Sequence, residues 1–248
     1  MSESISVDII IPCYNGAKFL EQSILSALNQ TYQNTRVLFV DNESTDDSLS
    51  IAKRIQEQNP QLVVLESPNL YEYSWQEPVS VAMKNCNGEY FTILAADDYI
   101  GPEYISKIVA IVEKTQRKIK VLQSPILGFS SQTNSRLDGL ISHSYKSIDE
   151  FRMLLFKKCP VNTPTVFYSR ELYDNGLIQW KSEIYKGSGD YNCYFNLTDN
   201  NIFVYPVPVW LGYHYRWHQD QSTWGMQKNF NGIDLKIKEF WKQRWNMP

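Results

Sequence analysis

The hydrophobic positions in the first half of the chain alternate between short apolar runs and helical stripes. The runs at 7–12, 36–40, 62–65 and 90–95 have the length of buried strands, and turn residues follow most of them. Between the first two runs, residues 18–28 carry apolar side chains three and four positions apart, as one face of a helix does. This alternation predicts a parallel sheet with right-handed crossovers and helices packed on its faces.

The second half of the chain has a less regular pattern. From Ser124 to Ser147 the regular pattern gives way to Gly, Ser, Asn and His, and we expect a long loop or an irregular insertion with a functional role. The last segment, Asp234–Trp245, predicts an amphipathic helix. The remaining patterns predict helices after Pro102, at 148–157 and at 190–197, and strands at 120–122, 165–168, 204–208 and 213–217.

Composition narrows the class of protein. At 248 residues, the chain fits one large domain or two small ones. The net charge of −3 argues against nucleic acid as a partner. The four cysteines are far apart and form no Cys-x-x-Cys pair, so zinc and redox motifs are not expected. No leader and no run of 18 apolar residues is present, so we expect a cytoplasmic protein.

Two adjacent carboxylates, Asp97 and Asp98, directly follow the apolar run at 90–95. Ligands of open α/β sheets bind just beyond the carboxyl ends of the strands. Divalent cations prefer oxygen ligands, so this position suits a cation site. The same acids can instead cap the helix that begins after Pro102, because carboxylates are favourable at a helix N-terminus.

Several motifs together resemble one known family, the family-2 glycosyltransferases. They are VDIIIPCYNG at 7–16, LNQTY at 28–32, VDNESTD at 40–46, the GEY strand at 88–98, GDY at 189–191 and YRWH at 215–218. The resemblance implies a GT-A fold, an α/β architecture in which helices flank a Rossmann-like, mostly parallel central sheet. It implies a glycosyltransferase domain at 1–222, with a nucleotide-sugar half at 1–123 and an acceptor half at 124–222. Residues 223–248 are then a C-terminal helical tail.

The resemblance also implies a reaction. An inverting enzyme of this kind moves a sugar from a UDP- or dTDP-sugar to a saccharide or lipid-linked acceptor, in cell-surface polysaccharide or glycolipid assembly. It uses Mn²⁺ or Mg²⁺. The alternative is a weak or inactive module that binds a nucleotide sugar or glycan, because Ala95 replaces the first acid of the metal motif and Val79-Ser80 replaces an Arg-Asn pair. A nucleotidyltransferase is less consistent, because no Gly-rich basic loop follows the first strand.

The resemblance assigns residues to the donor. Asp41 stands where the family reads the nucleobase, with a local turn role as the alternative. Asn15 belongs to the same pocket, or is a turn residue that tolerates left-handed geometry. The donor-binding set implied by the resemblance is Pro12, Tyr14, Asn15, Asp41, Asp97 and Arg216.

The resemblance likewise assigns the chemistry. Asp98 is the expected metal ligand, joined by His218, whose neutral imidazole can ligate a metal. Asp190 is the expected general base, with a helix N-cap as its alternative role. The apolar side of the C-terminal helix could contact an anionic membrane or pack on its own domain, and we expect packing.

Overall fold

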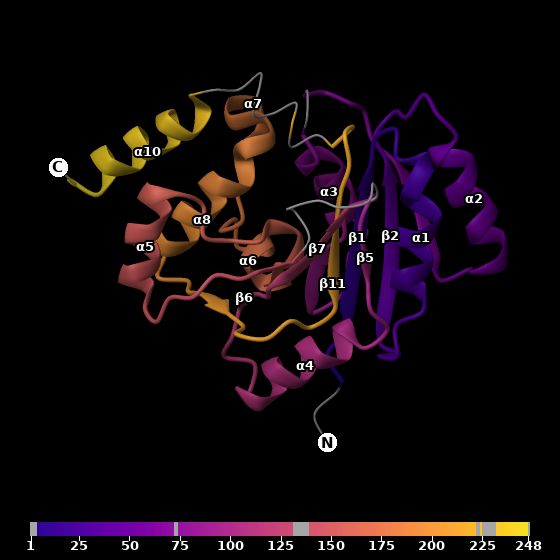
Figure 1. Cartoon of the computed structure of the whole chain (residues 1–248), viewed down its shortest axis with the longest axis horizontal. Coiled ribbons are helices and arrows are strands. Elements are labelled where there is room, and N and C mark those ends of the chain that lie inside the picture. Colours follow the sequence, from indigo (N-terminus) through magenta and orange to yellow (C-terminus); the bar gives the residue numbers. More distant parts are fainter. Residues whose placement is uncertain (1–3, 72–73, 131–138, 222–223, 225–231, 248) are drawn as a thin grey trace.

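The computed structural model describes residues 4–71, 74–130, 139–221, 224 and 232–247. Its main sheet has seven strands in the order β10-β6-β9-β4-β1-β2-β3 (Figure 1). All neighbouring strands of this sheet are parallel except β9, which is antiparallel to both β4 and β6. The strands are β1 (Val7–Cys13), β2 (Thr35–Asp41), β3 (Leu62–Glu66), β4 (Tyr90–Ile93), β6 (Val121–Gln123), β9 (Phe167–Ser169) and β10 (Val204–Pro206).

Helices cover both faces of this sheet, which explains why its strands are apolar at successive positions rather than at alternate ones. Ile9 and Ile11 of β1 pack toward α1 and α4, whereas Ile10 packs toward α3 and α8. The mostly parallel sheet flanked by helices predicted from the sequence is therefore confirmed. The longer helices are α1 (Ala17–Leu28), α2 (Ser48–Gln58), α3 (Gln76–Met83), α4 (Tyr104–Lys114), α5 (Ile148–Lys157), α8 (Gly189–Asp199) and α10 (Ile233–Arg244).

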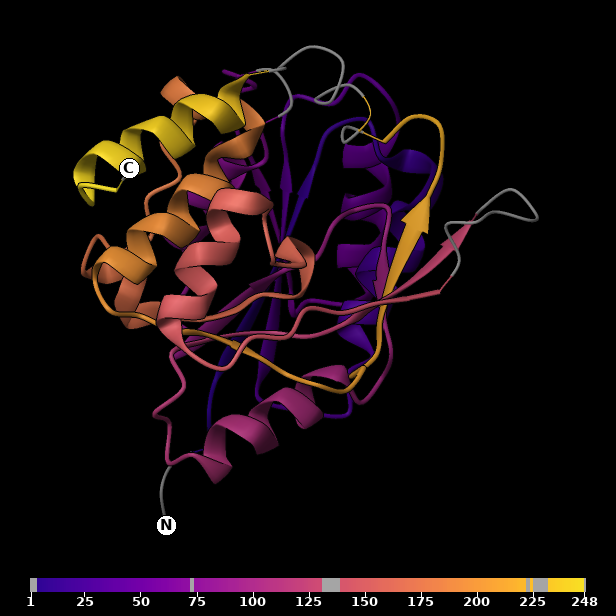
Figure 2. The ribbon, with the colours of Figure 1, turned by 60° about the vertical axis from the view of Figure 1, so that its left-hand side comes forward.

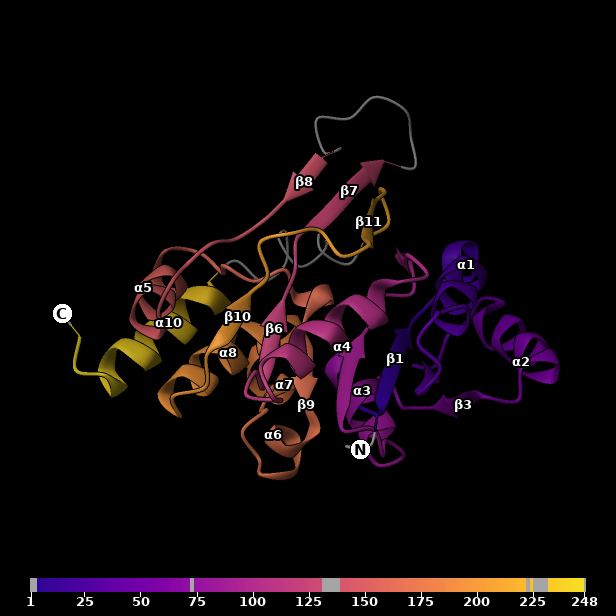
Figure 3. The same cartoon turned by 90° about the horizontal axis from the view of Figure 1, so that it is seen from below.

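A second sheet stands beside the first, and it corrects the prediction of a long loop at Ser124–Ser147. This segment contains the strands β7 (Ile126–Ser130) and β8 (Gly139–Ile141), which pair in antiparallel register. The four strands of the second sheet run in the order β5-β11-β7-β8, where β5 is Tyr99–Ile100 and β11 is Tyr213–Trp217. Figure 3 shows β7 with β8 and β11 beside it. The strands are short apolar runs, ILGFS and GLI, within a Ser-rich segment, and their stability comes from pairing between β7 and β11, which are distant in sequence. Residues 131–138 of the segment lie outside the described residues.

Short helical turns lie between the longer elements of the second half of the chain. They are α6 (Arg170–Asp174), α7 (Ser182–Tyr185), η1 (Thr163–Thr165) and η2 (Lys186–Ser188). The turn η2 leads directly into α8, so the first residues of α8 are fixed by the turn before them. No helix among the described residues is long and apolar enough to cross a membrane.

The C-terminal helix α10 packs on α8, and Figure 2 shows it beside α8 and α5. The ring of Trp241 stacks on Phe195 with centroids 5.8 Å apart, and its Nε1–H donates to Asn192 Oδ1 at 3.0 Å. The apolar side of the helix is thus used within the chain, as expected. Residues 225–231 of the predicted tail lie outside the described residues, and the domain boundaries stay predictions.

Three loops converge at the carboxyl ends of β1, β2 and β4, where the parallel strands end on one edge. Side chains tie the first two loops together: Asn15 Oδ1 accepts from Thr45 N at 2.8 Å, and Asp46 accepts from Ala17 N at 3.0 Å. From the β4 loop, the Ala95 carbonyl accepts from Ser23 of α1 at 3.1 Å. The hydrogen bonds fix the relative positions of these three loops.

Candidate active site

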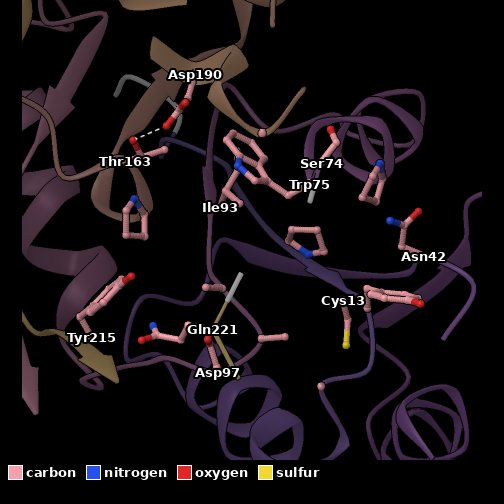
Figure 4. A pocket seen from close by; sticks show the side chains of 18 of the residues that line it. Cys13, Asn42, Ser74, Trp75, Ile93, Asp97, Thr163, Asp190, Tyr215 and Gln221 are labelled. Atoms are coloured by element: carbon pink, nitrogen blue, oxygen red, sulfur yellow. Dashed lines mark hydrogen bonds between the residues drawn. The ribbon is translucent and has the colours of Figure 1, made fainter. Parts of the chain in front are cut away.

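A cleft of about 1640 Å³ opens above the three converging loops and continues toward α8 (Figure 4). Its walls come from β1, the loops after β2 and β4, the η1 turn, the start of α8, β11 and the start of α10. The polar or aromatic side chains that line it include Tyr14, Asn15, Lys18, Asn42, Trp75, Asp97, Asn162, Thr163, Asp190, Tyr215, His218, Gln221 and Asp234. The cleft has the size to hold a nucleotide sugar together with part of an acceptor.

One end of the cleft carries buried oxygen acceptors from the loop after β2. Asp41 is 3% exposed, and its Oδ2 accepts from Ser44 N at 3.0 Å. The other oxygen, Oδ1, is buried without a partner among the described residues, as is Oδ1 of Asn42. Buried acceptors are costly unless they are hydrogen-bonded, so these atoms are suited to the N–H groups of a ligand. Asn42 lines the cleft, whereas Asp41 lies just behind the lining.

The turn after β1 forms the adjoining wall. Pro12 and Tyr14 line the cleft, and the Tyr14 side chain is 54% exposed. Asn15 has φ of 52°, the left-handed geometry that Asn tolerates, and its side chain is hydrogen-bonded to Thr45. Asn15 therefore both lines the cleft and links the two loops.

The acids after β4 point in different directions. Asp97 lines the cleft, and its Oδ2 lies 2.9 Å from Nε2 of His218. Asp98 is fully buried, with Oδ2 accepting from the Tyr213 hydroxyl at 2.9 Å and Oδ1 from Arg216 N at 2.7 Å. Burial raises the pKa of Asp98 well above its ordinary value, and the adjacent charge of Asp97 raises it further.

Asp97 and His218 give the cleft a carboxylate oxygen and an imidazole nitrogen at one point. No three His, Cys, Asp or Glu side chains gather as a metal cluster within the described ranges. Two protein ligands suit a Mg²⁺- or Mn²⁺-type site that substrate phosphates complete, because such ions are commonly held by one or two side chains plus phosphate oxygens. The residues present therefore fit a cation that arrives with a diphosphate.

Arg216 contacts the Asp97 backbone but is not among the residues that line the cleft. The guanidinium sits 4.3 Å from the ring centre of Phe19 and 4.7 Å from that of Phe129. Its Nε donates to the Asp97 carbonyl at 2.7 Å, and burial lowers its pKa. In this geometry Arg216 holds the Asp97 backbone in place, and its charge is available to a phosphate only at longer range.

The far end of the cleft carries Asp190, in the first turn of α8. Its Oδ2 accepts from the Thr163 hydroxyl at 2.7 Å, as drawn in Figure 4. Burial raises the pKa of Asp190 to about 6, and the Thr163 hydrogen bond acts against this rise. A carboxylate with a pKa near neutrality is suited to proton transfer, since general bases work best near the operating pH.

Gly189 precedes Asp190, and the backbone leaves no room for a side chain there. A Cβ atom at this position would lie 2.4 Å from the Trp180 carbonyl oxygen. A residue with a side chain at this position would therefore require the Trp180 backbone or the start of α8 to shift.

Asp234 is a cleft residue that the sequence reasoning did not identify. It stands at the start of α10, and its charge contributes to the raised pKa of Asp190. Thr163 and Trp75 are further lining residues that were missed. Their positions follow from turns and from tertiary packing, and no local sequence pattern marks them.

Comparisons with known proteins identify the family to which this chain belongs. The model described as Glycosyl transferase family 2 matches residues 8–177. The chain belongs to this family. An uncharacterized glycosyltransferase of Haemophilus influenzae is 31% identical over 108 residues, covering 44% of this chain and 33% of that protein. Glycosyltransferase GlyG of Streptococcus pneumoniae serotype 4 is 31% identical over 121 residues, covering 49% and 39%. This family-2 chain therefore spans about a third to two-fifths of the length of these relatives.

Solved structures show the same fold. The S. aureus TarS fragment 1-349 in complex with UDP-GlcNAc has a TM-score of 0.69 at 19% identity, covering 88% of this chain and 60% of that one. Mannosyltransferase PcManGT from Pyrobaculum calidifontis, in complex with GDP-Man and Mn²⁺, has a TM-score of 0.64 at 16% identity, covering 92% and 61%. The predicted membership of the glycosyltransferase family and the predicted GT-A fold are confirmed.

Proposed function

We propose that this chain is an inverting glycosyltransferase that moves a sugar from a UDP- or dTDP-sugar to a saccharide or lipid-linked acceptor, in cell-surface polysaccharide or glycolipid assembly. The observation that carries the proposal is that one cleft is lined by Asn42, which follows Asp41 in the chain, by the Asp97–His218 pair and by Asp190. We match these groups to the base, the diphosphate and the reacting sugar of a nucleotide sugar.

At the nucleotide end, the unpaired Oδ1 of Asp41 accepts the ring N–H of a pyrimidine base. Tyr14 and Pro12 flank the base, and Asn42 offers a second acceptor. The bound GDP-Man of PcManGT makes a guanosine donor the natural comparison in a test. A buried acceptor gains most from a ligand that satisfies it, so the base contributes selectivity as well as affinity.

At the diphosphate, Asp97 and His218 hold the Mn²⁺ or Mg²⁺ that the donor brings. We assign this role to Asp97 rather than to the expected Asp98, because Asp98 is buried and both of its oxygens already accept hydrogen bonds. A bound cation would neutralise charge on the departing nucleoside diphosphate. Arg216 contributes indirectly, by fixing the Asp97 backbone.

At the reacting sugar, Asp190 takes the proton from the acceptor hydroxyl as that oxygen attacks the anomeric carbon. The bond from the anomeric carbon to the diphosphate oxygen breaks at the same time, and the configuration at the anomeric carbon is inverted. The nucleoside diphosphate leaves with the electron pair, and Asp190 later returns its proton to solvent.

The test is transfer by the purified chain with Mn²⁺, across UDP-, dTDP- and GDP-sugars and a panel of saccharide and lipid-linked acceptors. We expect product of inverted configuration with a uridine or thymidine donor, and loss of transfer in Asp190→Asn. The absence of nucleotide binding by calorimetry, together with no transfer across the panel, would count against the proposal.

A binding module without turnover is the second candidate. Two observations favour it. Ala95 stands where the family has the first acid of its metal motif, and Lys18 is the one Lys or Arg among the described residues that line the cleft. It predicts nucleotide-sugar binding with an unchanged donor after long incubation. The same panel separates the two candidates, because only the enzyme releases nucleoside diphosphate.

A further inference from the structure

A line of three hydroxyl groups leads from the buried core to Asp190. The Tyr168 and Tyr194 hydroxyl oxygens lie 3.4 Å apart, Tyr194 donates to Thr163 Oγ1 at 3.1 Å, and Thr163 donates to Asp190 Oδ2 at 2.7 Å. Tyr168 lies on β9, Tyr194 on α8 and Thr163 on η1. The line therefore joins the main sheet to the catalytic end of the cleft.

The direction of these hydrogen bonds follows from counting protons. An ionised carboxylate only accepts, so the single Thr163 proton points at Asp190. Thr163 Oγ1 must then accept from Tyr194, whose own proton is used in that bond. Tyr194 in turn can only accept from Tyr168. Burial raises the pKa of both tyrosines well above the ordinary value, so both remain proton donors. All three O–H dipoles thus point toward the carboxylate.

The turn that carries Thr163 is held rigidly on its other side. Gln123 accepts from Asn162 N at 2.8 Å, and Asn162 Nδ2 donates to the Ser124 carbonyl at 3.0 Å. The Thr165 hydroxyl accepts from Ser124 N at 3.0 Å and donates to backbone carbonyls. Side-chain bonds on both sides of Thr163 fix its hydroxyl, so it can hold Asp190 in one rotamer.

We propose that Thr163, supported by Tyr194, is a positioning residue that orients Asp190 and keeps it an unprotonated acceptor facing the acceptor hydroxyl. This proposal rests on the proposed base role of Asp190. The aligned hydroxyls reinforce one another, since linked hydrogen bonds polarise each other in a dry interior. They offset the cost of holding a carboxylate in a partly buried position.

The Tyr191 backbone N–H also donates to Asp190, to Oδ1 at 2.7 Å, and lowers its pKa, whereas the other side chains facing Asp190 raise its pKa or are uncharged. Asp234, at the start of α10, raises the pKa of Asp190 by charge repulsion. Cys159, before η1, and Cys193, on α8, face the same region, and burial raises the pKa of both thiols, so they remain uncharged. Lys238 of α10 lies 5.9 Å from the ring centre of the neighbouring Tyr191. Thr163 is thus the main neighbouring side chain that stabilises the ionised form by a direct contact.

The test is a pH titration of the Asp190 carboxyl group, monitored by ¹³C NMR of the whole chain labelled at its Asp residues. The Asp190 signal is assigned as the one that is missing from the spectrum of Asp190→Asn. Thr163→Val removes the hydroxyl and keeps the side-chain shape, whereas Thr163→Ser keeps the hydroxyl. The double variant Thr163→Val/Tyr194→Phe removes the Tyr194 donor that Thr163→Val leaves without an acceptor, so the group left unpaired is the Tyr168 hydroxyl, which does not contact Asp190. A hydrogen bond to a charged group is strong enough to move a titration midpoint by about one pH unit or more.

We expect the midpoint to rise by about one unit in Thr163→Val and in the double variant, and to stay in place in Thr163→Ser. Transfer should then fall about fivefold at pH 6 and little at pH 9, because only the ionised base is active. An unmoved midpoint in both Val variants would overturn the proposal. Full transfer activity in Asp190→Asn would instead defeat the base role, so the two failures are distinguishable.

Discussion

His218 Nε2 lies 2.9 Å from Asp97 Oδ2, although 121 residues separate the two in the chain. The contact exists because β11 returns beside β5, pairing His214 with Tyr99. The pairing of β11 in the second sheet therefore places the imidazole of His218 against the Asp97 carboxylate, which follows β4. Together the two side chains place a carboxylate oxygen and an imidazole nitrogen next to each other at the cleft wall.

Asp97→Asn should weaken Mn²⁺-dependent binding of UDP by at least about tenfold, since a charged ligand at the diphosphate is lost. The measurement is calorimetric titration of UDP with and without Mn²⁺. Uridine, which has no phosphates, is the matched control ligand and should bind the variant as it binds the parent. Equal loss for uridine and UDP would show that Asp97 acts on the base pocket instead.

Asp98→Ala should act on folding. The substitution leaves the Tyr213 hydroxyl and the Arg216 N–H buried without their acceptors, each costing about 1–3 kcal/mol, so we expect a loss of about 2–6 kcal/mol in the free energy of unfolding. Urea denaturation measures it. Asp97→Asn, at a more exposed position, is the control and should change stability by less than about 1 kcal/mol. A stable Asp98→Ala variant that no longer responds to Mn²⁺ would return the metal role to Asp98.

The pH dependence of transfer should follow Asp190. Burial raises the pKa of this carboxyl to about 6, so we expect transfer activity to be highest at pH values above 6. Activity should fall as the pH is lowered through 6, because the base becomes protonated. Asp190→Asn should lower transfer by about 10²–10⁴-fold with little change in donor affinity. An acid limb near pH 4 would indicate a different, solvent-exposed base.

Gly189→Ala should destabilise the chain, because the new Cβ would lie 2.4 Å from the Trp180 carbonyl oxygen and α8 would have to shift. Overpacking of this kind costs about 1–3 kcal/mol. Thermal unfolding measures it, with Gly101→Ala as the matched control, since the nearest atom to a Cβ at Gly101 is 3.6 Å away. Equal melting temperatures for the two variants would contradict the close contact at Gly189.

Trp241→Ala should detach the C-terminal helix. Trp241 is 3% exposed and fills the contact between α10 and α8, and truncating a buried Trp costs about 3–5 kcal/mol. Phe240→Ala is the control, because that ring is 46% exposed and its loss should change stability by less than about 0.5 kcal/mol. Equal destabilisation by both would mean that α10 packs differently.

Reduced sedimentation of Phe240→Ala with anionic vesicles would support the membrane contact, which stays a prediction.

The first hundred residues could be predicted well because their signals are local. Strands such as β1 and β4 are continuous apolar runs, and residues such as Asp41 follow directly at the strand ends. Periodicity and turn residues are enough to place such elements. The same local reasoning could not distinguish Asp97 from Asp98, because one residue of register decides which side chain enters the cleft.

The second half depended on contacts between distant residues, which a single sequence does not reveal. The strands β7 and β8 were missed because they are short apolar runs within a Ser-rich segment, and β11, the partner of β7, begins more than 80 residues later. Arg216 was expected at the donor phosphates, but its position between Phe19 and Phe129 follows from packing between elements. Thr163 carries no motif at all, and only the folded turn brings it to Asp190.

The most direct measurement is a crystal structure of the chain with a UDP- or dTDP-sugar and Mn²⁺. The account predicts the base N–H at Asp41 Oδ1, the cation between the diphosphate and the Asp97–His218 pair, and the anomeric carbon on the side of Asp190. A donor bound with its diphosphate away from Asp97 and His218, or with its sugar facing away from Asp190, would contradict it.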